Sequence, residues 1–447
     1  MRDGLPSDAA RPAPTTSAPT EDGIAFGIED PSPGHQSLRR AGALLAPAML
    51  VANLLGYAFN IVTSRWFLPA EYGALGSLLG VSLVAGIPAL ALQPVVARHT
   101  AVHVGAADSL GALWRTLTRW AVAVGAASAL VVVVTAPLTA RFLHLDSPWP
   151  VVWLALQLAT LPLVATYQGM LQGVERFRAL AVALLAAGIT RLAFGAAFVS
   201  IGWGVTGAMA ATAAGSAATA VLGAALVGRF GGRSTRRVPR LGHELSHTGV
   251  AMAALLVMAN VDVLLARHYL PATESGLYAV GAIVAKGMFW APQFVVVLLF
   301  PRLANPDRHA GIARRAAIGL ATLAGVGAGT LAIAARPVLR AAVGSGYERL
   351  APDAWAFAAV GGSLALAQLL LYARIAQGDR RITGVVAAVA AAEVVAVAGW
   401  LHDSLRQIVL TALVGSLVLV AVGLLAGARR AGAVAAGSPA RSAAVTP

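Results

Sequence analysis

The chain has 447 residues, of which 58% are hydrophobic and only 12% charged, with a formal net charge of +14. About 25% of the residues of a typical soluble domain are charged, so this composition excludes an ordinary soluble globular protein. The sequence contains no cysteine, which excludes disulfides and thiolate metal sites. A basic balance can indicate nucleic-acid binding, but basic cytoplasmic loops are usual in membrane proteins, so we expect no nucleic-acid partner.

Apolar runs of about twenty residues follow one another along the chain, each long enough to cross about 30 Å of hydrocarbon. Lipid offers the backbone no hydrogen bonds, and the runs do not alternate strictly, so helices are favoured over a barrel. The predicted fold class is an all-α integral membrane protein with about twelve spanning helices: 42–64, 74–97, 117–139, 150–170, 179–201, 203–228, 247–266, 276–299, 315–335, 354–373, 383–401 and 407–427.

These spans divide into two predicted six-helix bundles, residues 39–228 and 247–428, joined by a basic cytoplasmic linker at 229–246. The flanking segments 1–38 and 429–447 are poor in apolar runs and are predicted to be disordered cytoplasmic tails. The first of them has no apolar stretch of the kind found in a cleavable signal peptide.

The basic residues sort by alternate loops, which predicts the orientation. Most of the 33 fall on the side that holds both termini, and the rule that positive loops stay inside places this side in the cytoplasm. The opposite side has only Arg65, Arg141, Arg267, Arg336, Arg340, Arg349 and Arg406.

Two stretches share one pattern and indicate an internal repeat. The first span ends in Arg65-Trp-Phe-Leu-Pro-Ala-Glu-Tyr-Gly73, and the seventh ends in Arg267-His-Tyr-Leu-Pro-Ala-Thr-Glu-Ser-Gly276. Six spans per repeat is an even number, so the halves are predicted to be parallel, around a central cavity. Transporters built from repeats bind substrate between the halves and alternate access by rocking them.

Longer stretches around these residues resemble bacterial polysaccharide transporters: Asn53-Leu-Leu-Gly-Tyr-Ala-Phe-Asn-Ile-Val-Thr-Ser-Arg-Trp-Phe-Leu-Pro-Ala-Glu-Tyr-Gly-Ala-Leu75, Tyr167-Gln-Gly-Met-Leu-Gln-Gly-Val-Glu-Arg-Phe177 and Asn260-Val-Asp-Val-Leu-Leu-Ala-Arg-His-Tyr-Leu270. These transporters are the O-antigen flippase-like members of the multidrug/oligosaccharidyl-lipid/polysaccharide (MOP) exporter superfamily. The resemblance covers about residues 40–427, and some members of that family have fourteen spans.

The resemblance implies a plasma-membrane flippase that moves a polyprenyl-pyrophosphate-linked oligosaccharide, or a related cell-surface polysaccharide precursor, from the inner to the outer leaflet. It implies a lipid-linked glycan and membrane lipids as partners, with a polysaccharide polymerase and glycosyltransferases beside them. It implies no ATPase domain, and the sequence has no Gly-x4-Gly-Lys-Ser/Thr loop. No cofactor and no metal are expected.

Two basic residues fall inside predicted spans, where a charge is costly and usually faces a cavity or a partner. We interpret Lys286 and Arg191 as contacts for a substrate phosphate. The alternatives are a lysine paired with a carboxylate and an arginine neutralised by Asp262. Lys286 lies on a predicted cavity-facing stripe of Tyr278, Ala282, Lys286, Trp290 and Gln293.

Two acidic residues inside spans, Asp262 and Glu393, are candidates for carrying a coupling proton or cation, because burial makes a carboxylate easier to protonate. For Asp262 the alternative is a structural salt bridge. For Glu393 the alternative is a peripheral span with no functional role.

Further polar residues give two more hypotheses. Asn53, Tyr57 and Asn60 share a face of the first span and are predicted to bind sugar hydroxyls or, alternatively, to bond helices together. Gln168, Gln172 and Arg176 lie at the predicted cytoplasmic mouth and form either a gate or an ordinary polar helix end.

Arg65 and Arg267 sit at the outer edge beside aromatic residues, and snorkelling to the membrane interface is expected. The outer loops are short and carry no paired acidic motif, so an enzyme is not expected. The competing functions are an ion-coupled drug or small-molecule antiporter of the same superfamily and a non-transporting membrane protein of polysaccharide assembly.

Overall fold

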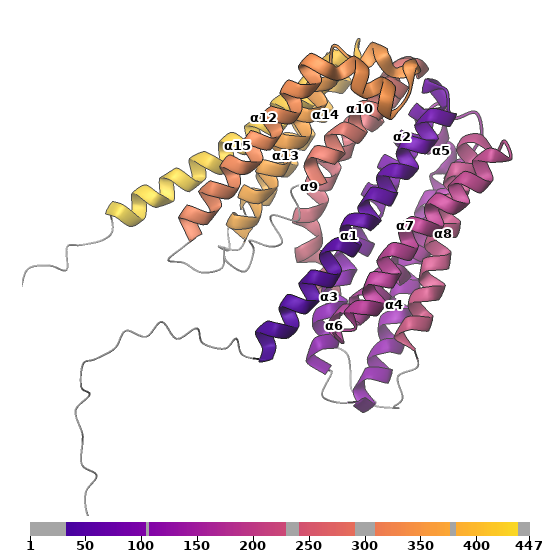
Figure 1. Ribbon diagram of the computed structural model, residues 1–447, viewed down its shortest axis with the longest axis vertical. Coiled ribbons are helices and arrows are strands. Elements are labelled where there is room, and N and C mark those ends of the chain that lie inside the picture. Colours follow the sequence, from indigo (N-terminus) through magenta and orange to yellow (C-terminus); the bar gives the residue numbers. More distant parts are fainter. Residues whose placement is uncertain (1–32, 104–106, 229–240, 291–308, 376–380, 437–447) are drawn as a thin grey trace, which may run out of the picture. The chain divides into compact units, whose positions relative to one another are not determined.

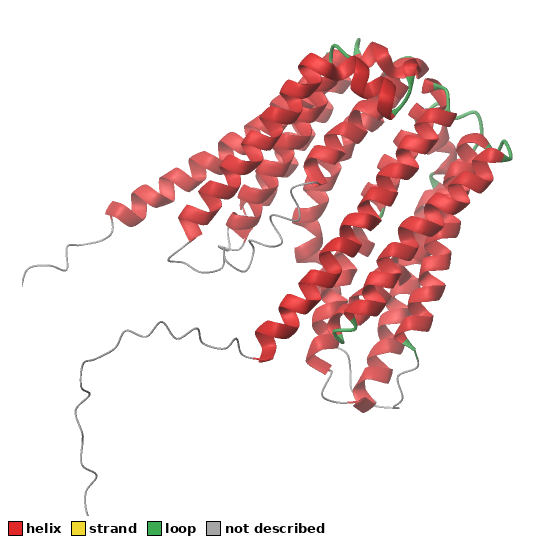
Figure 2. Cartoon of the chain, viewed as in Figure 1, coloured by secondary structure: helices red, strands yellow, loops and turns green. Residues whose placement is uncertain are grey.

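The computed structural model describes residues 33–103, 107–228, 241–290, 309–375 and 381–436. Within these segments the backbone is helical apart from short connections, and no strand is present (Figure 2). From Ala43 onward the chain forms one compact unit, and the packing described below lies inside it.

Within each described segment, the helices follow one another through short connections (Figure 1). In the N-terminal half they are α1 (Pro33–Trp66), α2 (Pro69–Ala85), α3 (Ile87–His103), α4 (Ala107–Val134), α5 (Ala136–Phe142), α6 (Trp149–Gly173), α7 (Phe177–Ser200) and α8 (Gly204–Val227). In the C-terminal half they are α9 (Leu241–Tyr269), α10 (Ala272–Trp290), α12 (His309–Ala342), the 3-10 helix η1 (Ser345–Leu350), α13 (Ala354–Ile375), α14 (Arg381–Gly399) and α15 (Leu405–Ala436).

The all-α membrane fold class is confirmed. Every predicted span falls on helix over its described residues, with 276–299 described only as far as Trp290. The second span falls on α2 and α3, which are bent by 42° at Gly86. Among the described residues, eight helices are long and apolar enough to cross a membrane, or nine if the bent pair is one span. The total of twelve spans therefore stays a prediction.

Three helix ends differ from the predicted domain bounds, which stay predictions. Helix α1 begins at Pro33 and α15 continues to Ala436, inside the predicted disordered tails, and α9 begins at Leu241, inside the predicted linker. Hydropathy marks where lipid begins and ends, but a helix continues beyond the lipid wherever its residues favour helix. The alanines and arginines after residue 427 do so.

Each half is packed around one central helix, α6 in the N-terminal half and α13 in the C-terminal half. Small residues allow close approach: a Cβ built on Gly125 of α4 would lie 2.2 Å from the carbonyl oxygen of Ala159 in α6. In the other half, a Cβ on Gly362 of α13 would lie 2.2 Å from the Cβ of Ala324 in α12. Such contacts are needed because lipid provides no hydrophobic force between helices.

Hydroxyl pairs add a second link at matching places in the two halves. Thr160 of α6 donates to Ser216 of α8 at 2.8 Å, and Ser363 of α13 bonds Ser416 of α15 at 2.7 Å. The central helix is thus joined to the last helix of its own half in both cases, as the predicted internal repeat requires.

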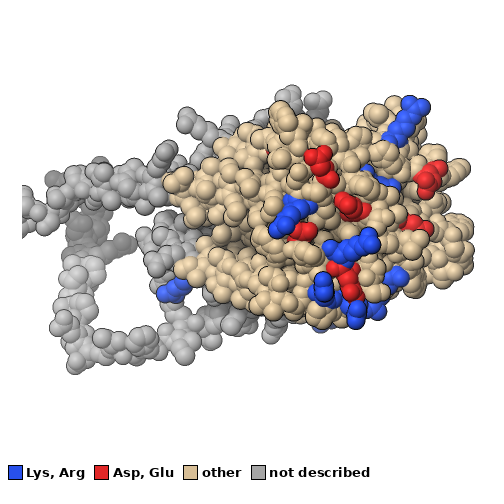
Figure 3. Space-filling model, turned by 90° about the horizontal axis from the view of Figure 1, so that it is seen from above, with Lys and Arg blue, Asp and Glu red and all other residues tan. Residues whose placement is uncertain are grey.

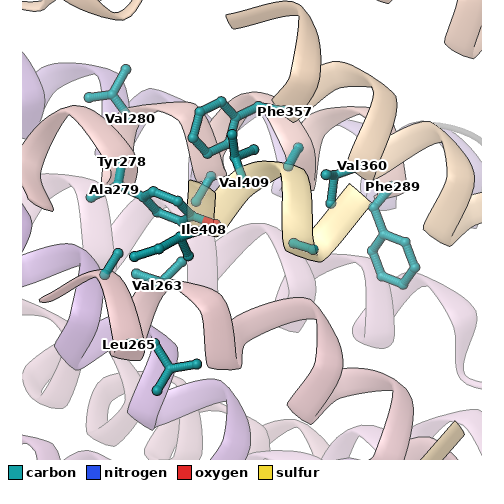
Figure 4. Packing of buried hydrophobic residues seen from close by; sticks show 14 of the residues in the cluster. Val263, Leu265, Tyr278, Ala279, Val280, Phe289, Phe357, Val360, Ile408 and Val409 are labelled. Carbon is teal, nitrogen blue, oxygen red and sulfur yellow. The ribbon is translucent and has the colours of Figure 1, made fainter. Parts of the chain in front are cut away.

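The core of the C-terminal half contains a buried tyrosine that matters below. Tyr278 of α10 packs edge-on against Phe357 of α13, with ring centroids 4.9 Å apart, and Val409 of α15 lies beside them (Figure 4). Tyr278 therefore faces the interior of its own half.

The two halves meet chiefly where α2 lies against α10 and α9 (Figure 1). Equivalent residues of the repeat touch there: a Cβ on Gly73 would lie 2.9 Å from the backbone nitrogen of Gly276, and a Cβ on Gly76 would lie 2.6 Å from the Cβ of Ala279. Contact between equivalent positions is what an axis relating two parallel repeats produces.

Gly276→Ala is expected to destabilise the protein by about 1–3 kcal/mol, the usual cost of overpacking. The added Cβ would lie 1.7 Å from the carbonyl oxygen of Pro69, a backbone atom that cannot swing aside. The measurement is the thermal unfolding midpoint in detergent. Gly319→Ala on α12 is the control, because a Cβ there meets nothing within 4 Å. Equal midpoints for the two variants would contradict the α2–α10 contact.

Candidate functional site

A cavity lies between the two halves, bordered by α1, α2, α3, α6, α7 and α8 of the N-terminal half and by α9 and α10 of the C-terminal half. It consists of two pockets of about 250 and 470 Å³ that share lining residues, and we call their union the central cavity. The shared residues are Tyr57, Asn60, Leu83, Gln157, Leu161, Arg191 and Lys286.

Arg191 reaches the central cavity from the middle of α7. Its guanidinium carbon lies 4.2 Å from the centroid of the Phe59 ring on α1, a cation–π contact that partly compensates the half-buried charge. Gly215 of α8 leaves room behind it, because a Cβ there would lie 3.1 Å from the Arg191 backbone. The Arg191 Nε is buried without a hydrogen-bond partner. The predicted alternative, neutralisation by Asp262, is wrong, because the ion pairs found among the described residues do not include Arg191.

Lys286 reaches the same cavity from α10, so each half contributes one cation. It also borders a third, small pocket of about 20 Å³ together with Asp262. Of the predicted stripe on α10, Ala282, Lys286 and Trp290 line these pockets.

Tyr278 does not belong to that stripe, which corrects the sequence interpretation. Steps of four residues drift around a helix of 3.6 residues per turn, and three such steps carry the face away from Tyr278. Ala279 lines the cavity in its place. Gln293, the remaining residue of the stripe, lies outside the described residues.

The polar residues of α1 line the central cavity. Asn53, Tyr57 and Asn60 all border its larger pocket. Asn60 is also held by other groups, because its Nδ2 donates to the Gly56 carbonyl at 2.9 Å and its Oδ1 accepts from the Tyr72 hydroxyl at 3.3 Å. Asn60 therefore joins α1 to α2 as the alternative predicts, and its binding of sugar hydroxyls stays a prediction, as it does for the exposed Asn53.

Sequence reasoning missed a polar wall opposite α1. Gln157 of α6 accepts a hydrogen bond from Thr212 of α8 at 3.1 Å, and Ser216 lines the cavity beside them. A glutamine in the middle of an apolar run was a signal that could have found this wall. Because Thr212 occupies the Gln157 oxygen, the amide NH2 of Gln157 is left to face a ligand.

The two cations of the cavity and the NH2 of Gln157 are therefore hydrogen-bond donors, whereas the Asn53 amide both donates and accepts. Arg191 and Lys286 can only donate, and the remaining groups of Gln157 also donate. A ligand that presents several acceptors, such as a phosphate, fits this set of partners. A cationic ligand would face two like charges.

A second group of polar atoms lies in the interior of the C-terminal half. The Tyr278 hydroxyl donates to Asp262 Oδ2 at 2.8 Å, while Asp262 Oδ1 is buried without a partner. Both carboxylate oxygens of Glu393 on α14 are also buried without a partner. Unpartnered buried acceptors are rare, and a bound proton or small cation would satisfy them.

Many described residues of α14 are exposed, as the prediction of a peripheral span expects, but Glu393 lies on the buried face of this helix. Glu393 is 3% exposed, and a Cβ on Gly415 of α15 would lie 3.5 Å from its Oε2. Met258 of α9 closes the same space. Within the described part of the chain, no cluster of three or more His, Asp or Glu residues forms a metal site.

The predicted gate residues differ in their exposure to solvent. Gln168 is buried and Gln172 is exposed. Arg176 donates to the carbonyls of Leu226 at 3.3 Å and Val227 at 3.5 Å, and so caps the end of α8 within the N-terminal half. This bond fits the alternative of a polar helix end, and the gate stays a prediction.

No family description and no curated protein matches the sequence. Solved structures match over most of the chain. An inward-facing multidrug resistance MATE family transporter of the MOP superfamily has a TM-score of 0.67 at 15% identity, covering 89% of this chain and 100% of its own. The chain has the fold of the MOP transporters. An outward-facing structure of such a MATE transporter has a TM-score of 0.58 at 15% identity, covering 91% and 100%.

The lipid II flippase MurJ, in an inward closed conformation, also has this MOP fold. Its TM-score is 0.65 at 12% identity, with 86% of this chain and 87% of MurJ covered. The fold thus occurs in a multidrug transporter and in a lipid flippase, and at these identities the likeness concerns the fold alone.

Proposed function

We propose that the protein is a flippase that moves a polyprenyl-pyrophosphate-linked oligosaccharide, or a related cell-surface polysaccharide precursor, across the plasma membrane by alternating access. The observation that carries the proposal is the pair of cations, Arg191 and Lys286, that face one cavity from opposite halves. The ion pairs of the described residues, Arg340 with Glu348 and Arg406 with Asp353, include neither. Their charge is available to a pyrophosphate.

The rest of the cavity suits a glycan next to that pyrophosphate. Tyr57 and Trp290 offer ring faces, and Asn53 and Gln157 offer amides that can bond sugar hydroxyls. The MOP fold supports a transport role, and the flippase MurJ among its structures supports a lipid-linked substrate.

A drug antiporter is the second candidate, and the likeness to MATE transporters favours it. The charge of the central cavity argues against the cationic drugs that an anionic cavity would attract, since two cations line it here. The flippase proposal accounts for these cations directly.

For energy coupling we propose that Asp262 and Glu393 bind a proton or a small cation in turn with the substrate. Asp262 and Lys286 border the same small pocket, and Lys286 also lines the central cavity. Asp262 therefore links the buried carboxylates to the cation that faces the substrate. Protonation or ion binding at Asp262 would change the field felt by Lys286 and therefore its hold on an anion.

Depletion of the protein in its own cells tests the proposed function. Polyprenyl-pyrophosphate-linked glycan is expected to accumulate in the cytoplasmic leaflet, measured as glycan that an added external glycosidase cannot reach. Restoring the protein should return it to the outer leaflet. An unchanged leaflet distribution together with altered drug efflux would reject the flippase and favour the antiporter. The polymerase and glycosyltransferases proposed as partners would then lose their basis too.

A further inference from the structure

One end of the molecule carries the connections 67–68, 143–148, 201–203, 270–271, 343–353 and 400–404, and we call it the short-loop end (Figure 1). Seen from above, basic and acidic side chains lie intermixed at this end (Figure 3). Two of its arginines, Arg65 and Arg267, are equivalent in the internal repeat, and neither forms one of the ion pairs found here.

Arg267 of α9 crosses from the C-terminal to the N-terminal half. Its Nε donates to the Leu143 carbonyl at 2.8 Å, and a terminal nitrogen donates to the His144 carbonyl at 3.0 Å. The other terminal nitrogen donates to Ala70 at 3.3 Å and to the Ser275 hydroxyl at 3.0 Å. Arg267 is 7% exposed, so the expectation that it snorkels to the membrane interface is wrong.

The backbone around its acceptors is shaped for this contact. His144 has a φ of 46°, a left-handed conformation that is uncommon outside glycine. His268, the neighbour of Arg267, bonds the preceding carbonyl of Phe142 through its Nδ1 at 2.9 Å. Three successive carbonyls of the N-terminal half are thus bound by two neighbouring side chains of the C-terminal half.

Arg65 of α1 makes the reverse crossing, from the N-terminal to the C-terminal half. Its Nε donates to the Ala342 carbonyl at 2.9 Å, and a terminal nitrogen donates to the Ala341 carbonyl. A tyrosine supports the same crossing, because the Tyr347 hydroxyl of η1 donates to the Phe67 carbonyl at 3.4 Å.

The acceptors on the two sides are equivalent as well. Leu143 follows α5, a short helix that continues the line of α4 and has Pro137 in its first turn. Ala342 ends α12, which is kinked at Ala334 just before Pro337. Each half therefore offers the carbonyls that end its third span to the arginine that ends the first span of the other half.

Carbonyls at a helix end have no donor within the helix and lie at the negative end of its dipole. An arginine presents several donors in a fixed plane and can bond two such carbonyls at once. Separating the halves at this end would leave the carbonyls and the Arg65 guanidinium unpaired and would leave Arg267 only its bond to Ser275. No carboxylate partner takes part in these bonds.

We propose that Arg65 and Arg267 form a reciprocal latch that keeps the central cavity closed at the short-loop end and must release before the cavity opens there. The latch lies at the short-loop end of the α2–α10 contact. Gly76 meets Ala279 in this contact, and both residues line the central cavity. The idea that the latch releases to let substrate pass rests on the proposed function. The idea that the latch holds the cavity closed is independent of that function.

Cysteine labelling tests the latch. The sequence contains no cysteine, so only the introduced cysteine can react. Ile283 lines the central cavity, so Ile283→Cys reports its accessibility. A membrane-impermeant maleimide is added to sealed vesicles on the short-loop side only. Asp403→Cys, exposed at that end, gives the reference rate and identifies vesicles of that orientation.

Arg267→Gln is expected to raise the labelling rate of Ile283→Cys about tenfold, and Arg65→Gln to raise it as well, with the double variant highest. Arg267→Lys keeps the charge but cannot bond two carbonyls in a plane, so an intermediate rate is expected. Arg141→Gln is the control, because it removes an exposed arginine of the same end and should leave the rate unchanged.

An unchanged rate in folded Arg267→Gln protein overturns the latch. If Arg267→Gln fails to fold, the labelling rate of Arg65→Gln is the test. Arg65 is exposed, so its replacement leaves fewer buried polar groups without a hydrogen-bond partner. The labelling uses no substrate. A failed flippase experiment with raised labelling therefore rejects the proposed function and keeps the latch, and the reverse result rejects the latch alone.

Discussion

Arg191→Met and Lys286→Met are each expected to lower transport of a polyprenyl-pyrophosphate-linked glycan by about 30-fold or more, with the protein still folded. A charge-assisted hydrogen bond to a phosphate contributes about 2 kcal/mol, which corresponds to that factor. Methionine keeps the length and packing of the stem and removes only the charged group. The measurement is initial rates in proteoliposomes, compared at equal reconstituted protein.

The stability of these two variants separates a binding role from a structural one. Removing one partner of a buried ion pair costs about 3–5 kcal/mol, because the other charge is left unpaired. Neither residue takes part in an ion pair among the described residues, so the unfolding midpoint should stay equal or rise. Arg406→Met, which breaks an exposed pair with Asp353 at 3.4 Å, is the control for general loss of positive charge. Full transport by both cavity variants would end the cationic-cavity hypothesis.

Asp262→Asn and Glu393→Gln are expected to remove the stimulation of transport by an ion gradient. Both substitutions keep the shape of the side chain and remove the group that takes up a proton or a cation. The measurement is transport in proteoliposomes with an imposed proton gradient and, separately, with an imposed sodium gradient. The unmodified protein should respond to one of them, and each variant should keep only the rate seen without a gradient.

Asp353→Asn is the matched control for the carboxylate variants, because Asp353 lies at the short-loop end and pairs there with Arg406. It should respond to the gradient as the unmodified protein does. A gradient response that survives in both Asp262→Asn and Glu393→Gln would show that their buried oxygens serve another purpose. A response to neither gradient in the unmodified protein would point to energy from downstream use of the product.

Part of the candidate site could be predicted from the sequence, and there is a physical reason why some of its residues were found and others were missed. Charges inside apolar runs are costly, so Lys286 and Arg191 were conspicuous in the sequence, and both line the central cavity. Gln157 was missed, because a single neutral polar residue in a span costs far less than a charge and is easily passed over. Arg267 was misread, because proximity to aromatic residues in sequence does not reveal a carbonyl on another helix.

The sequence by itself determined the helical membrane class and predicted the spans and the internal repeat, because hydropathy, the need to satisfy backbone hydrogen bonds in lipid and repeated spacing are local properties of the chain. Only the tertiary structure decided which polar residues meet. In the structure Arg191 forms no ion pair with Asp262, and Asp262 accepts a hydrogen bond from Tyr278 instead. Glu393 is buried between helices, and Arg267 donates to the Leu143 carbonyl of the other half. Partners so far apart along the chain are brought together by helix packing, and helix packing depends on small residues and crossing geometry that no single span encodes.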